Sequence, residues 1–204
     1  MRKIILASQS PRRKELLAQM GVQFEAIPSD FVENLDNART PEAVAKELAL
    51  SKAMSVARLN PDAIVIGSDT IVSMNGVQLG KPRNEAEARK VLKFLAGNSN
   101  FVTTALAVIC LADGVRAVLA ETAEVHFWPY NEVLVNAYLA TGDSADKAGS
   151  YGIQSRAAPL IAYYRGNYDT IVGLPTHLLA PILQKLGYTN AHAVTLKTPV
   201  QNRG

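Results

Sequence analysis

The sequence predicts an α/β protein with a mixed sheet, on three observations. Short apolar runs typical of buried strands alternate with segments of helical period along most of the chain. Two long strand-like runs, 101–114 and 115–128, meet at the turn-forming pair Asp113-Gly114, which predicts an antiparallel pair. With 204 residues, 48% of them hydrophobic, the chain can bury a full core as one domain or one domain with two lobes.

The first elements are a strand, a helix and a second strand. The apolar run KIILA at 3–7 predicts a short buried strand. Ser10 and Pro11 are typical of the N-cap and first residue of a helix, which we expect to continue to Gly21. The run VQFEAIP at 22–28 is a candidate strand.

A long helix and a hairpin follow. Thr40 precedes a helix that we expect from Pro41 to about Arg58, where Asn and Pro stop it. The run AIVIGSDTIVSM at 63–74 begins as a continuous apolar strand. An Asn-Gly pair at 75–76 then favours a tight hairpin turn into a short return strand.

Two more helices flank the predicted antiparallel pair. Asn84, with Glu87 three residues later, resembles a capping box for a helix ending near Gly97. Asn131 caps another helix, which stops at Gly142.

The last third of the chain is less regular. Segment 142–154 (GDSADKAGSYGIQ) is rich in Gly, Ser and Asp, so we expect a loop over the surface or over a cleft. Segment 159–166 is a strand, and 168–175 leads into a final helix that Pro181 should kink or interrupt. From about His192 we expect a loose tail.

Composition narrows the function classes. The net charge is +3, from 21 basic and 18 acidic residues with no long basic run, so bulk charge does not indicate nucleic-acid binding. Cys110 is the single cysteine, which excludes a disulfide framework and a thiolate metal site. The N-terminal apolar stretch is too short for a signal peptide, and no segment reaches the roughly 18 apolar residues of a membrane span. We expect a cytoplasmic protein without a membrane segment.

The first predicted helix carries cations at an unfavourable end. Arg12 and Arg13 lie in its first turn, where the helix dipole and the unpaired backbone N–H groups favour anions. Ser8 and Ser10 flank the same turn, so hydroxyl and N–H groups there are able to surround a phosphate while the arginines supply charge. We expect a polyphosphate at this turn; the alternative is a surface cap with two solvated arginines.

Asp69 interrupts an apolar strand. A carboxylate at the carboxyl end of a buried strand points into the crevice where open α/β sheets bind ligands. It is suited to holding a divalent cation or orienting an attacking water, and the alternative is a turn aspartate that caps local backbone. Lys81, between Gly80 and Pro82, is by itself typical of a solvated lysine.

Two further charged residues become candidates for the site only when they are considered together with the other polar residues. Glu33 is an acid in a loop, and Lys52 lies on a helix. Several cations, two carboxylates and hydroxylated turns at element ends are what phosphoryl chemistry needs, because charge must be neutralised while water is activated. The three histidines lie far apart without metal-ligand spacing, and no GxxxxGK[ST] loop is present.

At this point the motifs resemble a known family. LASQSPRRKELL, GSDTIV, GKP, DKAGSYGIQ and VGLP occur, from about Ile4 to Gly187, in the order and spacing of the Maf family of nucleoside triphosphate pyrophosphatases. The resemblance implies one two-lobed domain over 1–191, related to inosine triphosphatases and with a central cleft, and a flexible tail over 192–204. It also implies a homodimer that cleaves a nucleotide between its α- and β-phosphates with a divalent cation, Mg²⁺ first and Mn²⁺ or Co²⁺ as alternatives.

The resemblance also implies roles for individual residues. Asp69 matches the catalytic base, and Glu33 matches the acid that assists metal or substrate binding; we expect Glu33 and Asp69 to hold the metal. Arg12, Thr70 and Gln154 match positions associated with substrate choice in the dTTP/UTP branch. Arg12 also matches a polyphosphate contact of the family, and the other such matches are Ser8, Arg13, Lys52 and Lys81.

Two alternatives to this function stay open. The 7-methyl-GTP branch usually carries a glutamine after the catalytic aspartate, and Thr70 argues against it. A nucleotide-binding regulator of cell division has no need of a base, so the intact Asp69 argues against that class. One departure is Asn100, which stands where many members have a histidine; asparagine hydrogen-bonds but cannot titrate near neutral pH.

Overall fold

The computed structural model describes residues 2–31, 38–195, 198 and 200–203. They form an eight-stranded mixed sheet in the order β2-β1-β3-β5-β6-β7-β8, with β4 paired to β3. The strands are β1 (Ile4–Leu6), β2 (Glu25–Ala26), β3 (Ile64–Met74), β4 (Val77–Leu79), β5 (Ser99–Cys110), β6 (Val115–Phe127), β7 (Ile161–Arg165) and β8 (Gln201–Asn202). The predicted α/β class with a mixed sheet is therefore confirmed.

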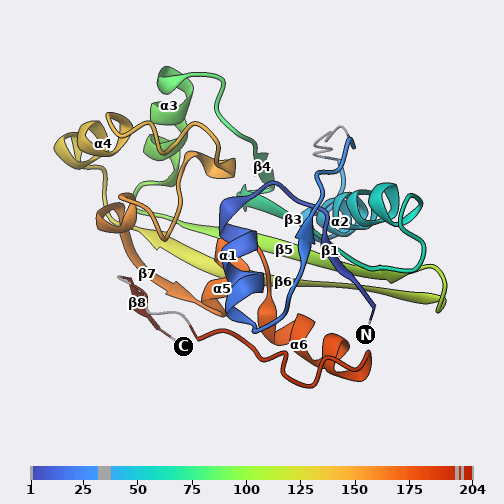
Figure 1. Ribbon diagram of the computed structural model, residues 1–204. Coiled ribbons are helices and arrows are strands. Elements are labelled where there is room, and N and C mark those ends of the chain that lie inside the picture. The colour runs from blue at the N-terminus through green and yellow to red at the C-terminus, as the bar shows by residue number, and fades with distance from the viewer. Residues whose placement is uncertain (1, 32–37, 196–197, 199, 204) are drawn as a thin grey trace.

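Helices cover both faces of this sheet (Figure 1). Helix α2 covers one face, whereas α1, α5 and α6 pack on the other and α3 and α4 gather at one end. Among these residues, no helix has the length and apolar content to span a bilayer. The helices are α1 (Pro11–Gln19), α2 (Pro41–Ala57), α3 (Glu85–Leu95), α4 (Glu132–Leu139), α5 (Tyr168–Val172) and α6 (Thr176–Lys185).

Alternation along β1 and β3 divides the core into two clusters. Ile5 and Val65 pack with α2, whereas their neighbours Ile4, Leu6 and Ile64 pack with α1 and the C-terminal helices. Successive side chains of a strand point to opposite faces, so a strand covered on both sides must be apolar throughout. A polar residue in the middle of β3 consequently lies in contact with one helical layer or the other.

The local signals mostly act as predicted. The side chains of Thr40, Asn84 and Asn131 accept hydrogen bonds from backbone N–H groups of Ala43, Glu87 and Leu134, so each caps its helix. Asn75 and Gly76 both have positive φ, as the tight turn between β3 and β4 requires. Strands β5 and β6 form the expected long antiparallel pair.

The C-terminal part differs from expectation in two places. Helix α6 runs without interruption through Pro181, and a separate short helix, α5, precedes it. The described part of the segment after His192 is attached to the sheet, because Gln201–Asn202 pair in parallel with β7. Val200, beside that strand, is buried, and this apolar contact explains the attachment.

Candidate active site

A cavity opens beside β3, where the strand paired with one of its edges changes from β1 to β4. Strand β1 pairs with Ile64–Ile66 and β4 pairs with Val72–Met74 on the same edge, while β5 follows the other edge along Val65–Ser73. Among the described strands, none pairs with residues 67–71 on that first edge. The cavity beside it has a volume of about 850 Å³.

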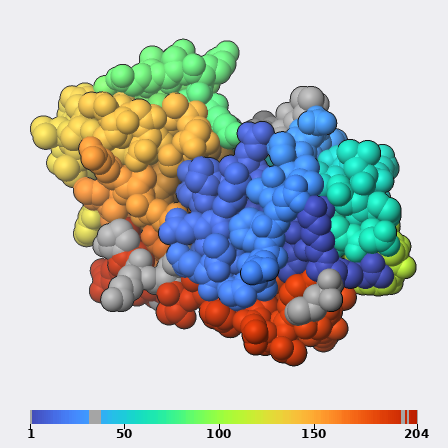
Figure 2. Space-filling model, in the orientation of Figure 1, coloured from blue at the N-terminus to red at the C-terminus, as the bar shows by residue number. Residues whose placement is uncertain are grey.

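The cavity brings together the described residues that the sequence singled out. Figure 2 shows the blue N-terminal segment beside the orange segment that follows α4, and both contribute to the cavity wall. Glu33 lies outside the described residues, so its metal-binding role stays a prediction. The predicted residues that line the cavity are Ser8, Ser10, Arg12, Arg13, Lys52, Asp69, Thr70, Lys81 and Gln154.

A buried ion pair lies on the α2 side of β3. Lys52 Nζ donates to Asp69 Oδ1 at 2.5 Å, and the two residues are only 7% and 4% exposed. Asp69 lies four residues after Val65 on β3, so the two side chains point to the same face of the sheet, toward α2. Removing one member of such a pair leaves an uncompensated buried charge, so each residue depends on the other and holds it in place.

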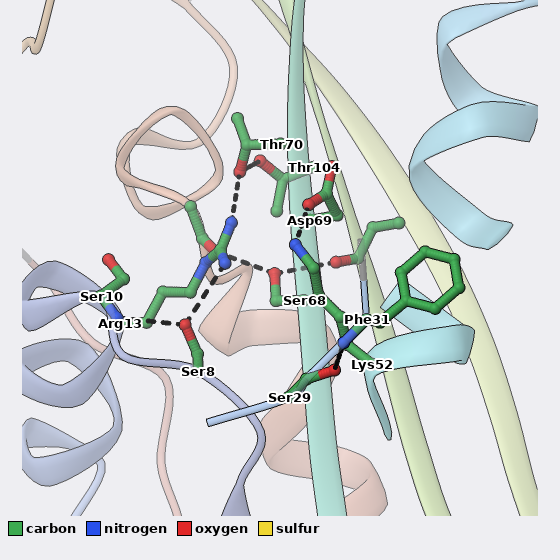
Figure 3. A network of polar contacts seen from close by, with 12 residues as sticks. Ser8, Ser10, Arg13, Ser29, Phe31, Lys52, Ser68, Asp69, Thr70 and Thr104 are labelled. Carbon is green, nitrogen blue, oxygen red and sulfur yellow. Dashed lines mark hydrogen bonds and ion pairs between the residues drawn. The ribbon is translucent and has the colours of Figure 1, made fainter. Parts of the chain in front are cut away.

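Arg13 approaches β3 from the opposite face (Figure 3). Its Nε donates to the Gly173 carbonyl at 2.9 Å, and its Nη2 lies 3.2 Å from Thr70 Oγ1. Gly173 has φ +117°, and a Cβ there would lie 3.2 Å from Thr70 Oγ1 and 3.4 Å from Arg13 Nε. Glycine therefore both permits this backbone and leaves room for the guanidinium.

The hydroxyl of Thr70 has a defined orientation. Thr104 Oγ1 donates to the Thr170 carbonyl at 2.7 Å, which uses its single proton. Thr70 Oγ1, 2.9 Å from Thr104 Oγ1, is therefore the donor in that pair and accepts from Arg13. Thr70 thus orients Arg13 through a chain of hydroxyls.

The turn before α1 keeps polar groups at the cavity. Ser8 Oγ accepts from the Ser10 N–H at 3.2 Å and lies 3.4 Å from Arg13 Nη1. Ser10 is the N-cap residue, yet its side chain makes no capping hydrogen bond. The first turn of α1 contains no acidic residue, so the positive end of its dipole faces the cavity without a local counter-charge.

The loop at 142–154 adds charged groups that lie in the DKAGSYGIQ motif but were not among the predicted site residues. Lys147 Nζ donates to the Asp143 carbonyl at 2.5 Å and to Asp146 Oδ1 at 2.7 Å, and Asp146 Oδ2 lies 3.6 Å from Arg12 Nη1. Burial raises the pKa of Asp146, but the hydrogen bond and charge of Lys147 and the charge of Arg12 outweigh it and leave that pKa below its ordinary value.

Two predicted residues remain exposed at the cavity. Lys81 and Gln154 both line it, and within the described chain neither makes a side-chain hydrogen bond or ion pair. Phe31, a residue that is 39% exposed, is a further lining residue that the sequence did not reveal. An isolated aromatic residue in a loop gives no local signal of a site, so the sequence gives no sign of Phe31, whereas Asp146 and Lys147 belong to the DKAGSYGIQ motif.

Asn100 does not line the cavity; it supports the cavity wall from the protein interior. It is fully buried, donates to the Val125 carbonyl at 2.9 Å and accepts from Tyr151 Oη at 2.7 Å. Tyr151 itself lines the cavity. Asn100 therefore anchors the wall formed by the loop at 142–154.

The donor set suits a cation that arrives with its ligand. No group of three or more His, Cys, Asp or Glu side chains within the described ranges is arranged to hold a metal ion. Asp69 is the carboxylate that β3 contributes to the cavity, and the other two described carboxylates of the wall, Asp143 and Asp146, belong to the loop at 142–154. Mg²⁺ is commonly bound by one or two carboxylates together with substrate phosphates, so this environment fits a cation bound to a polyphosphate.

Comparison with known proteins gives a consistent result. A family model described as Maf-like protein matches residues 3–186. A Bacillus cereus (strain ZK / E33L) protein named dTTP/UTP pyrophosphatase is 44% identical over 193 residues, which are 95% of this chain and 100% of the relative. Proteins of the same name from Bacillus thuringiensis subsp. konkukian (strain 97-27) and Bacillus anthracis match with the same identity and coverage.

Proposed function

The chain belongs to the Maf-like protein family, and from this membership we propose that it is a nucleoside triphosphate pyrophosphatase that hydrolyses dTTP and UTP. The products are the nucleoside monophosphate and pyrophosphate, which fits a role in clearing nucleotides from the cellular pool. The observation that carries the proposal is the buried Lys52–Asp69 pair in a cavity lined by further cations. A carboxylate beside phosphate-binding cations is the arrangement that water-dependent phosphoryl transfer requires.

The cations have distinct places around the polyphosphate. Arg13 is fixed by the Gly173 carbonyl and by Thr70, so its guanidinium is preorganised before a ligand arrives. Ser8 and Ser10 place hydroxyls at the α1 turn, where backbone N–H groups favour an anion. Lys81 is exposed at the cavity, so its ammonium group is suited to neutralise the charge of pyrophosphate as it leaves.

Asp69 is the proposed base. Its carboxylate accepts a proton from a water molecule as the water oxygen attacks phosphorus, and the bond between the α- and β-phosphates breaks with pyrophosphate as the leaving group. Lys52 orients the carboxylate, because its ammonium group donates to Asp69 Oδ1 at 2.5 Å.

A divalent cation completes the proposed machinery. Asp69 would hold it together with phosphate oxygens, and Glu33 is the predicted second carboxylate. When bound, such a cation neutralises charge on the phosphates. We propose that this cation is Mg²⁺, with Mn²⁺ and Co²⁺ as alternatives, because one or two carboxylates plus substrate phosphate oxygens are the environment that Mg²⁺ favours.

We assign the selectivity for the nucleobase to the cavity wall formed by the loop at 142–154. Gln154 is exposed at the cavity, and its amide presents one donor and one acceptor, as a pyrimidine edge requires. The family resemblance further supports a homodimer in the cytoplasm, and light scattering after size-exclusion chromatography tests the oligomeric state.

Pyrophosphate release tests this function. We expect turnover of dTTP and UTP with Mg²⁺ in a panel of the eight common nucleotides, 7-methyl-GTP and 5-methyl-UTP. Asp69→Asn should lower kcat by about 10²–10⁴-fold, the usual contribution of a general base. Asp62→Asn makes the same change in charge at an exposed position outside the cavity wall and serves as the matched control.

Each other outcome has a defined meaning. Near wild-type kcat in Asp69→Asn contradicts the role of the base, provided that circular dichroism shows both variants folded. Turnover centred on 7-methyl-GTP keeps the chemistry and overturns the pyrimidine assignment. Binding of nucleotides without turnover, with any of the three metals, favours a nucleotide-binding regulator.

A further inference from the structure

Asp146 lies between two cations of the cavity wall. Its Oδ1 accepts from Lys147 Nζ at 2.7 Å, and its Oδ2 is 3.6 Å from Arg12 Nη1. Arg12 belongs to α1, whereas Asp146 and Lys147 belong to the loop at 142–154. The carboxylate therefore joins two sides of the cavity and places its two oxygens where two cations converge.

The two cations are less exposed than the anion, and the Arg12 side chain is 32% exposed. The Lys147 side chain is 9% exposed, and its ammonium group also bonds to the Asp143 carbonyl. Its stem packs over Gly152, where an added Cβ would come within 2.7 Å of Lys147 Cε. The Asp146 side chain, by contrast, is 65% exposed. Of the three groups, Asp146 has the most freedom to leave.

A phosphate group is a stronger partner for the same cations. It carries more negative charge than a carboxylate and offers three acceptor oxygens, and arginine binds phosphate through two N–H groups. The exposed Asp146 ion pairs are weak, because solvent screens them and side-chain entropy opposes them. A polyphosphate in the cavity is thus able to displace the carboxylate.

We propose that Asp146 is an internal competitor of polyphosphate for Arg12 and Lys147. In this role it occupies the two cations when no ligand is present and returns to them as pyrophosphate leaves, which weakens product retention. The proposal rests on the proposed function for its place in the reaction, but the competition itself concerns any phosphate anion. It assigns Lys147 as an additional phosphate contact and Asp146 as a residue that sets affinity.

Binding of inorganic pyrophosphate tests the competition directly. Isothermal titration calorimetry on the wild-type protein and on Asp146→Asn, without nucleotide, should give a lower Kd for the variant, by about threefold to tenfold. Asparagine keeps the shape and hydrogen-bonding oxygen of the side chain but removes its charge. Asp146→Glu restores the charge and should return the Kd toward the wild-type value.

Asp143→Asn is the matched control. Asp143 lines the same cavity on the same loop, but its carboxylate is 4.0 Å from Lys147 Nζ and it has no ion pair with Arg12 within the described chain. Direct competition predicts a smaller change in Kd for this variant than for Asp146→Asn. An equal change in both would overturn the proposal, because it would indicate a general effect of charge on the cavity.

Other outcomes separate this inference from the proposed function. An unchanged or higher Kd in a folded Asp146→Asn protein, or no pyrophosphate binding by either protein at millimolar concentration, refutes the competition even if dTTP is hydrolysed. Tighter pyrophosphate binding in Asp146→Asn without nucleotide turnover by the wild type supports the competition and refutes the proposed function. Asp146→Ser replaces Asp146→Asn if the latter does not fold.

Discussion

Two adjacent residues of β3 contribute to different faces of the sheet. Asp69 contacts Lys52 on the α2 side, and Thr70 contacts Arg13 on the α1 side. The twofold period of a strand produces this separation without any turn or bulge. Two consecutive residues of one strand therefore position both the proposed base, Asp69, and the guanidinium of Arg13.

Replacing Thr70 by valine tests the chain of hydroxyls. Valine keeps the shape of threonine but cannot accept from Arg13 or donate to Thr104, so Arg13 loses a fixed orientation. We expect KM for dTTP to rise about twofold to tenfold, which corresponds to one hydrogen bond, with a smaller effect on kcat. Initial-rate kinetics measures both constants.

Thr70→Ser is the control for that change. Serine retains the hydroxyl and should keep KM near the wild-type value. If serine raised KM as much as valine, the methyl group rather than the hydroxyl would be responsible, and the orienting role of Thr70 would be wrong.

At the scale of elements, the close approach of α2 to β3 sets the geometry of the ion pair. Gly67 lies two residues before Asp69, and a Cβ there would come within 2.3 Å of the Ala49 carbonyl oxygen and 2.9 Å of the Ala53 nitrogen. Only glycine permits α2 to pack this near the strand. Lys52, on the same helix, reaches Asp69 because of this contact.

Gly67→Ala should separate the two elements. The extra methyl group meets backbone atoms, which cannot rotate away, so α2 must shift. We expect the free energy of unfolding to fall by about 1–3 kcal/mol, as for other overpacked cores, and kcat to fall because Lys52 moves from Asp69. Urea unfolding measures the first effect, and hydrogen exchange of the α2 amides locates it. Unchanged stability and unchanged exchange would show that the packing tolerates the methyl group.

At the scale of the whole molecule, burial of tyrosines couples stability to alkaline pH. Burial raises the pKa of Tyr138 to about 12 and raises the pKa of Tyr151 further. The folded protein therefore keeps phenolic protons that the unfolded chain releases near pH 10. This contribution to stability is fully present below pH 10 and is lost as the pH rises above it.

Unfolding measurements across that range test the coupling. Between pH 10 and 11 the free energy of unfolding should fall by about 1 kcal/mol for each tyrosine that stays protonated in the folded state, because the unfolded tyrosine is already half ionised at pH 10. Tyr151→Phe should reduce this slope. At pH 8 the same variant should be less stable by about 1–3 kcal/mol, because the buried Asn100 Oδ1 loses its donor.

The wild-type protein supplies the comparison for that variant. Equal slopes for the wild type and Tyr151→Phe would mean that Tyr151 ionises alike in both states, and would contradict the effect of burial. Equal stability at pH 8 would show that another donor reaches Asn100 after the substitution.

Much of the fold was predictable because its signals are local. The caps Thr40, Asn84 and Asn131 use backbone groups within three residues, and the turn at Asn75 depends on two adjacent residues. The attachment of β8 to β7 and the continuity of α6 were not predictable. A two-residue strand gives no periodic signal, and a proline inside a helix is tolerated only through packing that the sequence does not display.

By itself, the sequence determined the fold class, most elements and the set of candidate residues, because propensity, capping and motif spacing act over short stretches of chain. Only the tertiary structure decided which of these groups meet. Lys52 reaches Asp69 from 17 residues away, and Arg13 reaches the Gly173 carbonyl from 160 residues away. Those contacts depend on the register of β3 against β1 and β5 and on the packing of α2 and α5. Register and packing arise from the whole chain at once, so no local stretch of sequence specifies them.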